Sequence, residues 1–208
     1  MEQIYITYIV ALLAILDPIG IIPFYLTASS EVKAKQHTRL AVTLGVFVFF
    51  CLLAFIFAGT AILGFFGISL PAFQIAGGII LLLLGIEMIK GAAQTPEKKN
   101  VEMKKTHFKS VFAKMIVPIG IPLFVGPGSI STVVLYSSKL NSFEDKLHLA
   151  GLTAIVCAIV VLVLMMATKL QRKLGKTGLD VATRIMGLIL AAIAVQFLID
   201  GVTVAFNI

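Results

Sequence analysis

Long apolar stretches run through the whole chain and constrain its fold more than any other feature. Each is long enough to cross a bilayer, whose hydrocarbon core requires about 20 consecutive apolar residues per helix. They lie near residues 3–28, 39–64, 71–91, 111–138, 147–168 and 181–204. Hydrophobic residues make up 59% of the chain and charged residues 13%, more apolar surface than a water-soluble domain of this length can bury. The sequence therefore predicts an all-α integral membrane protein with six transmembrane helices.

Basic residues predict how these helices are oriented. They gather in the predicted loops between spans one and two, three and four, and five and six, or at the adjoining span ends, whereas Lys139 and Lys146 lie on the other side. Because Lys and Arg are retained on the cytoplasmic side, we expect these loops in the cytoplasm and both termini outside, in the plasma (inner) membrane of a prokaryote. This distribution accounts for the net charge of +7 without nucleic acid as a partner.

Two short patterns occur twice in the chain. The sequence Pro-Ile-Gly-Ile stands at residues 18–21 and again at 118–121. Two glycines of the third span, Gly77 and Gly91, have counterparts at equal spacing in the sixth span, Gly187 and Gly201. The repetition indicates that the chain consists of two related halves of three spans each.

Three spans per half place the two halves in opposite orientations across the membrane. Such inverted repeats are common among secondary transporters. We expect a first repeat at 1–93, a cytoplasmic linker at 94–109 and a second repeat at 110–208.

Proline and glycine interrupt the first span of each predicted repeat. Pro18, Gly20 and Pro23 fall within span one, and residues 118–128 of span four contain three prolines and three glycines. These residues break the helical hydrogen-bond ladder, and unpaired backbone groups in hydrocarbon cost several kcal/mol each. Two matched breaks therefore predict a central solute site lined by the exposed backbone. The alternative is that the prolines only kink helices and the glycines only allow close packing.

Asp17 lies at the first break, well inside the membrane. An ionisable residue at that depth is expensive and is a functional candidate by default. It could carry a proton, help to bind Na⁺ or contact a substrate ammonium group. It could also cap a half-helix that starts at Pro18.

Hydroxyl side chains follow the second break. We expect Ser129 to be the N-cap of a helix that restarts there, with its first amides free to bind a carboxylate. Ser131 and Thr132 could add donors, or all three hydroxyls could bond back to their own helix. The candidate substrate-binding residues are Asp17, Gly20, Pro23, Pro118, Gly120, Pro122, Gly126, Gly128, Ser129, Ser131 and Thr132, with Asp17 also the candidate for the coupling ion.

These motifs resemble those of the MarC family, also called the neutral amino acid transporter family and grouped with the LysE-type exporters. The resemblance rests on Asp17-Pro18-Ile19-Gly20 with Pro23, on residues 118–128 followed by Ser129, and on Arg184-Ile185-Met186-Gly187. It extends over essentially the whole chain. It implies six transmembrane helices and transport of small neutral amino acids such as glycine or alanine.

Three classes of function compete. The first is a secondary transporter for a small zwitterion, coupled to H⁺ or Na⁺, because the sequence has no nucleotide-binding loop and we expect no cofactor. The alternative is an ion or metal exporter of the same superfamily, which would need several carboxylates, thiols or imidazoles together, whereas only Asp17 is clearly placed at mid-membrane. An enzyme is disfavoured, because no histidine or lysine base is expected in the membrane near Ser129. Membrane lipid is an expected partner, and an oligomer is possible.

Overall fold

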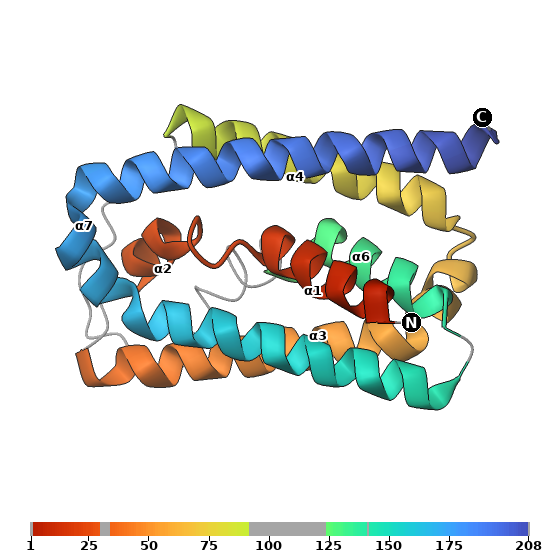
Figure 1. Ribbon diagram of the computed structural model, residues 1–208, viewed down its shortest axis with the longest axis horizontal. Helices are drawn as coiled ribbons and strands as arrows, with labels where there is room; N and C mark the ends of the chain where they lie inside the picture. Colours follow the sequence, from red (N-terminus) through yellow and green to blue (C-terminus); the bar gives the residue numbers. More distant parts are fainter. Residues whose placement is uncertain (1, 30–33, 92–123, 141, 208) are drawn as a thin grey trace.

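A computed structural model describes residues 2–29, 34–91, 124–140 and 142–207, and within these ranges the regular structure is entirely helical. The helices lie roughly along the long axis of the molecule (Figure 1). In chain order they are α1 (Glu2–Leu16), α2 (Ile22–Ala28), α3 (Ala34–Phe65), α4 (Leu70–Lys90), α6 (Pro127–Ser138) and α7 (Phe143–Phe206). The predicted all-α fold is confirmed for these residues. The predicted linker 94–109 and residues 111–123 of the fourth span lie outside them.

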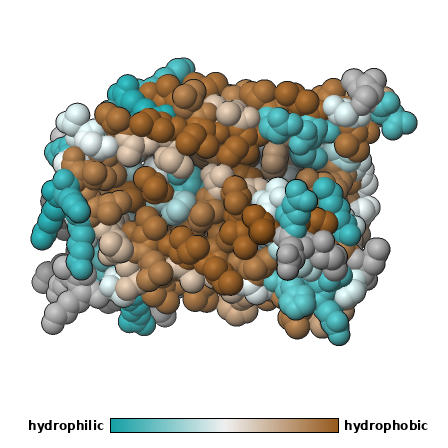
Figure 2. Space-filling model, in the orientation of Figure 1, coloured by the Kyte–Doolittle hydropathy of each residue, from teal (hydrophilic) through white to brown (hydrophobic). Residues whose placement is uncertain are grey.

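An apolar band crosses the middle of the molecule. Figure 2 shows hydrophobic surface across the centre of the visible face and hydrophilic groups concentrated toward the two ends of the long axis. Helices α3, α4 and α7 are long and apolar enough to cross a membrane. Large side chains such as Phe50, Leu83 and Leu162 are exposed on these helices, where lipid rather than water accounts for them. The arrangement is that of an integral membrane protein.

The predicted first span, 3–28, consists of two helices. Helix α1 has 15 residues, which at 1.5 Å per residue gives about 22 Å, short of the roughly 30 Å of a bilayer core. The chain leaves the helix at Asp17 and resumes at Ile22 in the seven-residue α2. The predicted interruption of this span is therefore confirmed.

The predicted fifth and sixth spans, 147–168 and 181–204, belong to one 64-residue helical element, and the loop expected between them is helical. The interruption is confined to Gly175, whose φ of 69° and ψ of 176° are accessible essentially to glycine alone. Figure 1 shows α7 turning back on itself at the left of the view, at the end of the molecule opposite the two chain termini. Two arms result, residues 143–174 and 176–206, each long enough to cross a bilayer.

Helix α4 packs closely against the second arm of α7. A Cβ atom built on Gly85 would lie 2.8 Å from the carbonyl oxygen of Gly187, and one on Gly78 would lie 3.0 Å from that of Ala194. Because lipid supplies no hydrophobic drive between helices, such close backbone approach provides much of the attraction. The second arm and α4 thus form one packed unit, and the break in the first span lies against it.

Candidate functional site

The break between α1 and α2 is a compact turn organised by Asp17. The amide of Asp17 donates to the carbonyl oxygen of Leu13 at 3.0 Å, and its own carbonyl accepts from the amide of Ile21 at 3.2 Å. Its side-chain Oδ1 accepts from the amide of Gly20 at 2.9 Å. Asp17 adopts a φ of 37°, in the left-handed region that Asp tolerates better than most residues. Asp17 therefore caps the turn. The following helix begins at Ile22, not at Pro18 as in the alternative in which Asp17 only caps a half-helix.

The second carboxylate oxygen of Asp17 has no hydrogen-bond partner among the residues that the structure describes. Asp17 is 5% exposed, and its Oδ2 is buried. A buried polar atom without a partner carries a desolvation cost that structures rarely retain without a purpose. In a membrane-spanning segment such a group is a candidate for binding a proton, a cation or an ammonium group.

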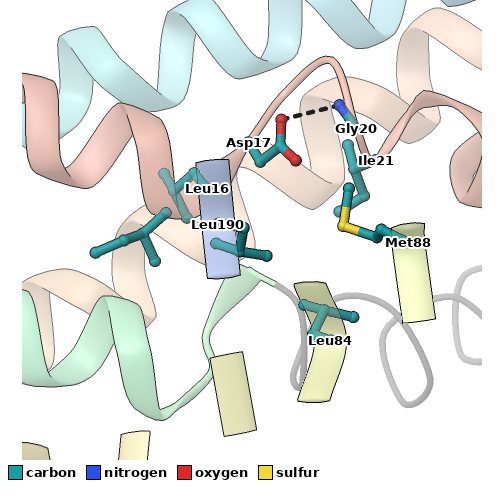
Figure 3. A pocket seen from close by; sticks show the side chains of 8 residues that line it. Leu16, Asp17, Gly20, Ile21, Leu84, Met88 and Leu190 are labelled. Carbon is teal, nitrogen blue, oxygen red and sulfur yellow. Dashed lines mark hydrogen bonds between the residues drawn. The ribbon is translucent and has the colours of Figure 1, made fainter. Parts of the chain in front are cut away.

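Asp17 lines a small pocket whose other lining residues are apolar or glycine. Figure 3 shows the Asp17 carboxyl group at the turn, with side chains of α4 and α7 opposite. Gly20 and Asp17 contribute the polar edge of the pocket. The remaining lining residues are Ile15, Leu16, Ile21, Leu84, Met88 and Leu190. In this conformation the pocket has space for about one water-sized group, and its single acceptor between apolar walls suits a cation or the ammonium end of a solute.

The second break lies just before α6. Phe124 and Val125 precede the helix, which begins at Pro127 with Gly126 as its N-cap in an extended conformation and without a capping side chain. The prediction that Ser129 is the N-cap is wrong, because this residue lies inside the first turn. By the geometry of an α-helix, the first amides of α6 have no partner within the helix.

The three hydroxyls after the second break donate to backbone carbonyls. Ser129 Oγ lies 2.7 Å from the carbonyl oxygen of Phe124 and 3.0 Å from that of Gly126. Thr132 Oγ1 donates to Gly128 at 2.9 Å, and Ser131 Oγ donates to Phe73 of α4 at 3.3 Å. All three residues are buried. Only Thr132 bonds back within its own helix, which was one of the two alternatives expected for these hydroxyls. Ser129 instead donates to residues that precede α6, and Ser131 donates to α4.

Leu81 links the two breaks. A Cβ built on Gly128 would overlap the Leu81 side chain, with Cγ at 2.7 Å. Leu81 also belongs to the buried cluster that contains Ile15, Met88 and Leu190 of the Asp17 pocket. The start of α6 and the Asp17 turn are therefore joined through one layer of apolar side chains on α4.

Of the predicted site residues, Asp17 and Gly20 line the pocket together. Pro23 is buried in the first turn of α2. Gly126, Gly128, Ser129, Ser131 and Thr132 gather at the start of α6, while Pro118, Gly120 and Pro122 lie outside the described residues. The six apolar lining residues were not predicted, because nothing distinguishes them from other apolar residues in an apolar span. In the described part of the chain, no three His, Cys, Asp or Glu side chains are grouped closely enough to hold a metal ion.

Comparison with known proteins extends over nearly the whole chain. The model of the MarC family integral membrane protein matches residues 2–206. A UPF0056 membrane protein of Aquifex aeolicus is 33% identical over 204 residues, which cover 95% of this chain and 92% of that protein. The UPF0056 membrane protein YhcE of Escherichia coli is 31% identical, covering 96% of this chain and 92% of that protein. A UPF0056 membrane protein of Pyrococcus abyssi is 34% identical, with coverages of 96% and 94%. No solved structure matches the chain.

Proposed function

Because this chain belongs to the MarC family of integral membrane proteins, we propose that it is a secondary transporter of small neutral amino acids, of the size of glycine or alanine, coupled to H⁺ or Na⁺. The observation that carries the proposal is the buried Oδ2 of Asp17, which has no partner among the described residues, at a helix break where Asp17 lines a small pocket. A carboxylate oxygen in that setting is an acceptor for the ammonium group of a zwitterion or for the coupling ion.

The second break supplies the complementary charge. The first turn of α6 begins at Pro127, and its amides, which have no partner within the helix and lie at the positive end of the helix dipole, favour a carboxylate. Leu81 covers Gly128 in the present conformation. We propose that the substrate carboxylate reaches these amides when Leu81 moves aside, while its ammonium group stays near Asp17. Pro23, Pro118, Gly120, Pro122 and Gly126 would then shape the two breaks rather than contact the solute through side chains.

Two features support an inverted repeat of residues 1–93 and 110–208, joined by the linker 94–109. The corner between α3 and α4 contains Gly67 at a φ of 67°, and the corner between the two arms of α7 contains Gly175 at 69°. These corners occupy the same place in the two proposed halves. Gly91 and Gly201, already paired by the sequence pattern, each pack against the partner half: Gly91 near Arg184 and Gly201 near Ile75.

The distribution of charge supports an orientation with both termini outside. The start of α3, the end of α4 and the corner of α7 lie at the same end of the molecule in Figure 1. Arg39, Lys90 and Lys173 are exposed there. The positive-inside rule assigns this end to the cytoplasm.

Transport by purified protein in liposomes tests the proposal. The wild-type protein should take up labelled glycine or alanine and exchange it for unlabelled substrate on the other side. Asp17→Asn, which removes the charge at nearly constant shape, should lower uptake at least tenfold. Asp200→Asn is the matched control, because Asp200 is exposed and bonded to Gln196 of its own helix. Folded wild-type protein that neither takes up nor exchanges any small neutral amino acid would exclude this function.

A further inference from the structure

The Met88 side chain reaches from α4 to the Asp17 turn. A Cβ built on Gly20 would overlap both Cε of Met88 and Oδ2 of Asp17. The end of the thioether therefore lies against the same point of the turn as the unpaired oxygen. Figure 3 shows the Met88 side chain extending toward Ile21 and Gly20 of the Asp17 turn. Met88 is 2% exposed, so its side chain is enclosed by protein.

Glycine lies on both sides of Met88. Gly20 faces the end of its side chain, and Gly187 of α7 lies behind its base, where an added Cβ would be 2.7 Å from Met88 Cβ. A side chain at either position would displace the methionine. The packing therefore fixes where the Met88 side chain begins, while its three rotatable bonds leave the thioether end adaptable.

The other walls of the pocket are less able to adapt. Ile15, Leu16 and Ile21 belong to the same short segment as Asp17, so their positions are tied to the turn itself. Leu84 and Leu190 are branched and have fewer rotatable bonds than methionine. Among the described lining residues, Met88 is thus the side chain whose length most directly limits the space beside Oδ2.

We infer that Met88 is the specificity-determining residue of this transporter and sets the largest amino acid side chain that can be accommodated beside Asp17. The inference rests on the proposed transport function and specifies the largest substrate side chain that the transporter accepts. Replacing Met88 by alanine removes Cγ, Sδ and Cε, as many heavy atoms as the side chain of valine contains. Replacing it by phenylalanine fills the pocket further.

Competition against uptake of labelled alanine measures this limit. Unlabelled glycine, alanine, valine and leucine are added in turn to liposomes that contain wild type, Met88→Ala or Met88→Phe. We measure how strongly valine inhibits uptake relative to alanine. In Met88→Ala this ratio should be about tenfold higher than in wild type, because one or two methylene groups in an apolar pocket discriminate substrates on that scale. For Met88→Phe we expect alanine to be excluded more strongly than glycine.

Met186→Ala is the matched control. Met186 is also a methionine and packs against the same buried cluster, but it does not line the pocket. In the Met186→Ala variant, the order in which the unlabelled amino acids inhibit alanine uptake should equal the wild-type order. The two Met88 variants should shift selectivity in opposite directions. Size-exclusion profile and thermal stability show whether each variant folds, and one folded variant suffices for the test.

The possible failures are distinct. A folded Met88 variant that transports alanine with the wild-type ranking of competitors would overturn the role of Met88 and leave the transport function intact. The same shift in Met186→Ala would also overturn it, because the effect would then come from general loosening of the cluster. A folded wild-type protein without amino acid transport would defeat the proposed function, and the assignment of Met88 with it.

Discussion

The backbone amide of Gly20 donates a hydrogen bond of 2.9 Å to Oδ1 of Asp17, while Oδ2 of the same carboxyl group has no partner in the described part of the chain. One oxygen closes the turn between α1 and α2, and the other faces the pocket. The structural and the proposed transport roles of Asp17 therefore reside on different atoms. Substitutions that keep one oxygen can separate them.

Asp17→Asn should fold as stably as wild type, whereas Asp17→Ala should be less stable. Asparagine retains an oxygen for the Gly20 amide and tolerates a φ of 37°. Alanine loses the capping bond, which is worth about 0.5–2 kcal/mol. Unfolding of the purified variants by heat or by titration with a denaturing detergent measures the difference. Equal losses of stability in the two variants would contradict the capping role of Oδ1.

Ser129→Ala should destabilise the second break. Its hydroxyl donates to the carbonyls of Phe124 and Gly126 in a buried setting, and a buried carbonyl left without a donor costs about 1–3 kcal/mol. Ser138→Ala is the control, because Ser138 makes the same kind of bond, to Leu135, at an exposed position. Thermal unfolding in detergent should separate the two variants. If both unfold at the same temperature, water or another donor replaces the Ser129 hydroxyl.

Gly175→Ala should destabilise the corner of α7. Alanine is strained at a φ of 69° and a ψ of 176°, a conformation that costs a non-glycine residue on the order of 1–3 kcal/mol. Gly151→Ala, in the helical first arm with open space around it, should be neutral or stabilising by up to about 1 kcal/mol. The comparison uses unfolding free energies of the two variants. A neutral Gly175→Ala would mean that the two arms can join without this backbone conformation.

Single cysteines should react from opposite sides of the membrane at the two ends of the molecule. With Cys51 and Cys157 replaced by alanine, Ser142→Cys at the start of α7 and Lys173→Cys near its corner offer two exposed positions. A membrane-impermeant maleimide added to intact cells should label the first, and labelling of the second should require inverted vesicles. The reverse pattern would place both termini in the cytoplasm and contradict the proposed orientation.

Features that depend on local chemistry were predicted well. The run of apolar residues identified a helical membrane protein, and Pro18 and Gly20 located the first break. The motif around Asp17 led to the MarC family, and the family is confirmed. Errors arose where the outcome depends on the exact point at which a helix begins. Serine is a residue type that favours the N-cap, but α6 begins at Pro127, so Gly126 and not Ser129 occupies that position.

The order of residues is enough to place the chain in a membrane, because no water-soluble domain of this length could bury so much apolar surface, and to place a carboxyl group at a helix break. How α7 turns at Gly175, where the hydroxyls of α6 donate, and which apolar side chains enclose Asp17 depend on the packing of the whole fold. Hydropathy and helix breaking act over a few neighbouring residues and are visible in the chain. The placement of Met88 beside Oδ2 depends on α4 being held against α7 through Gly187, a contact between segments about 100 residues apart that no local pattern records.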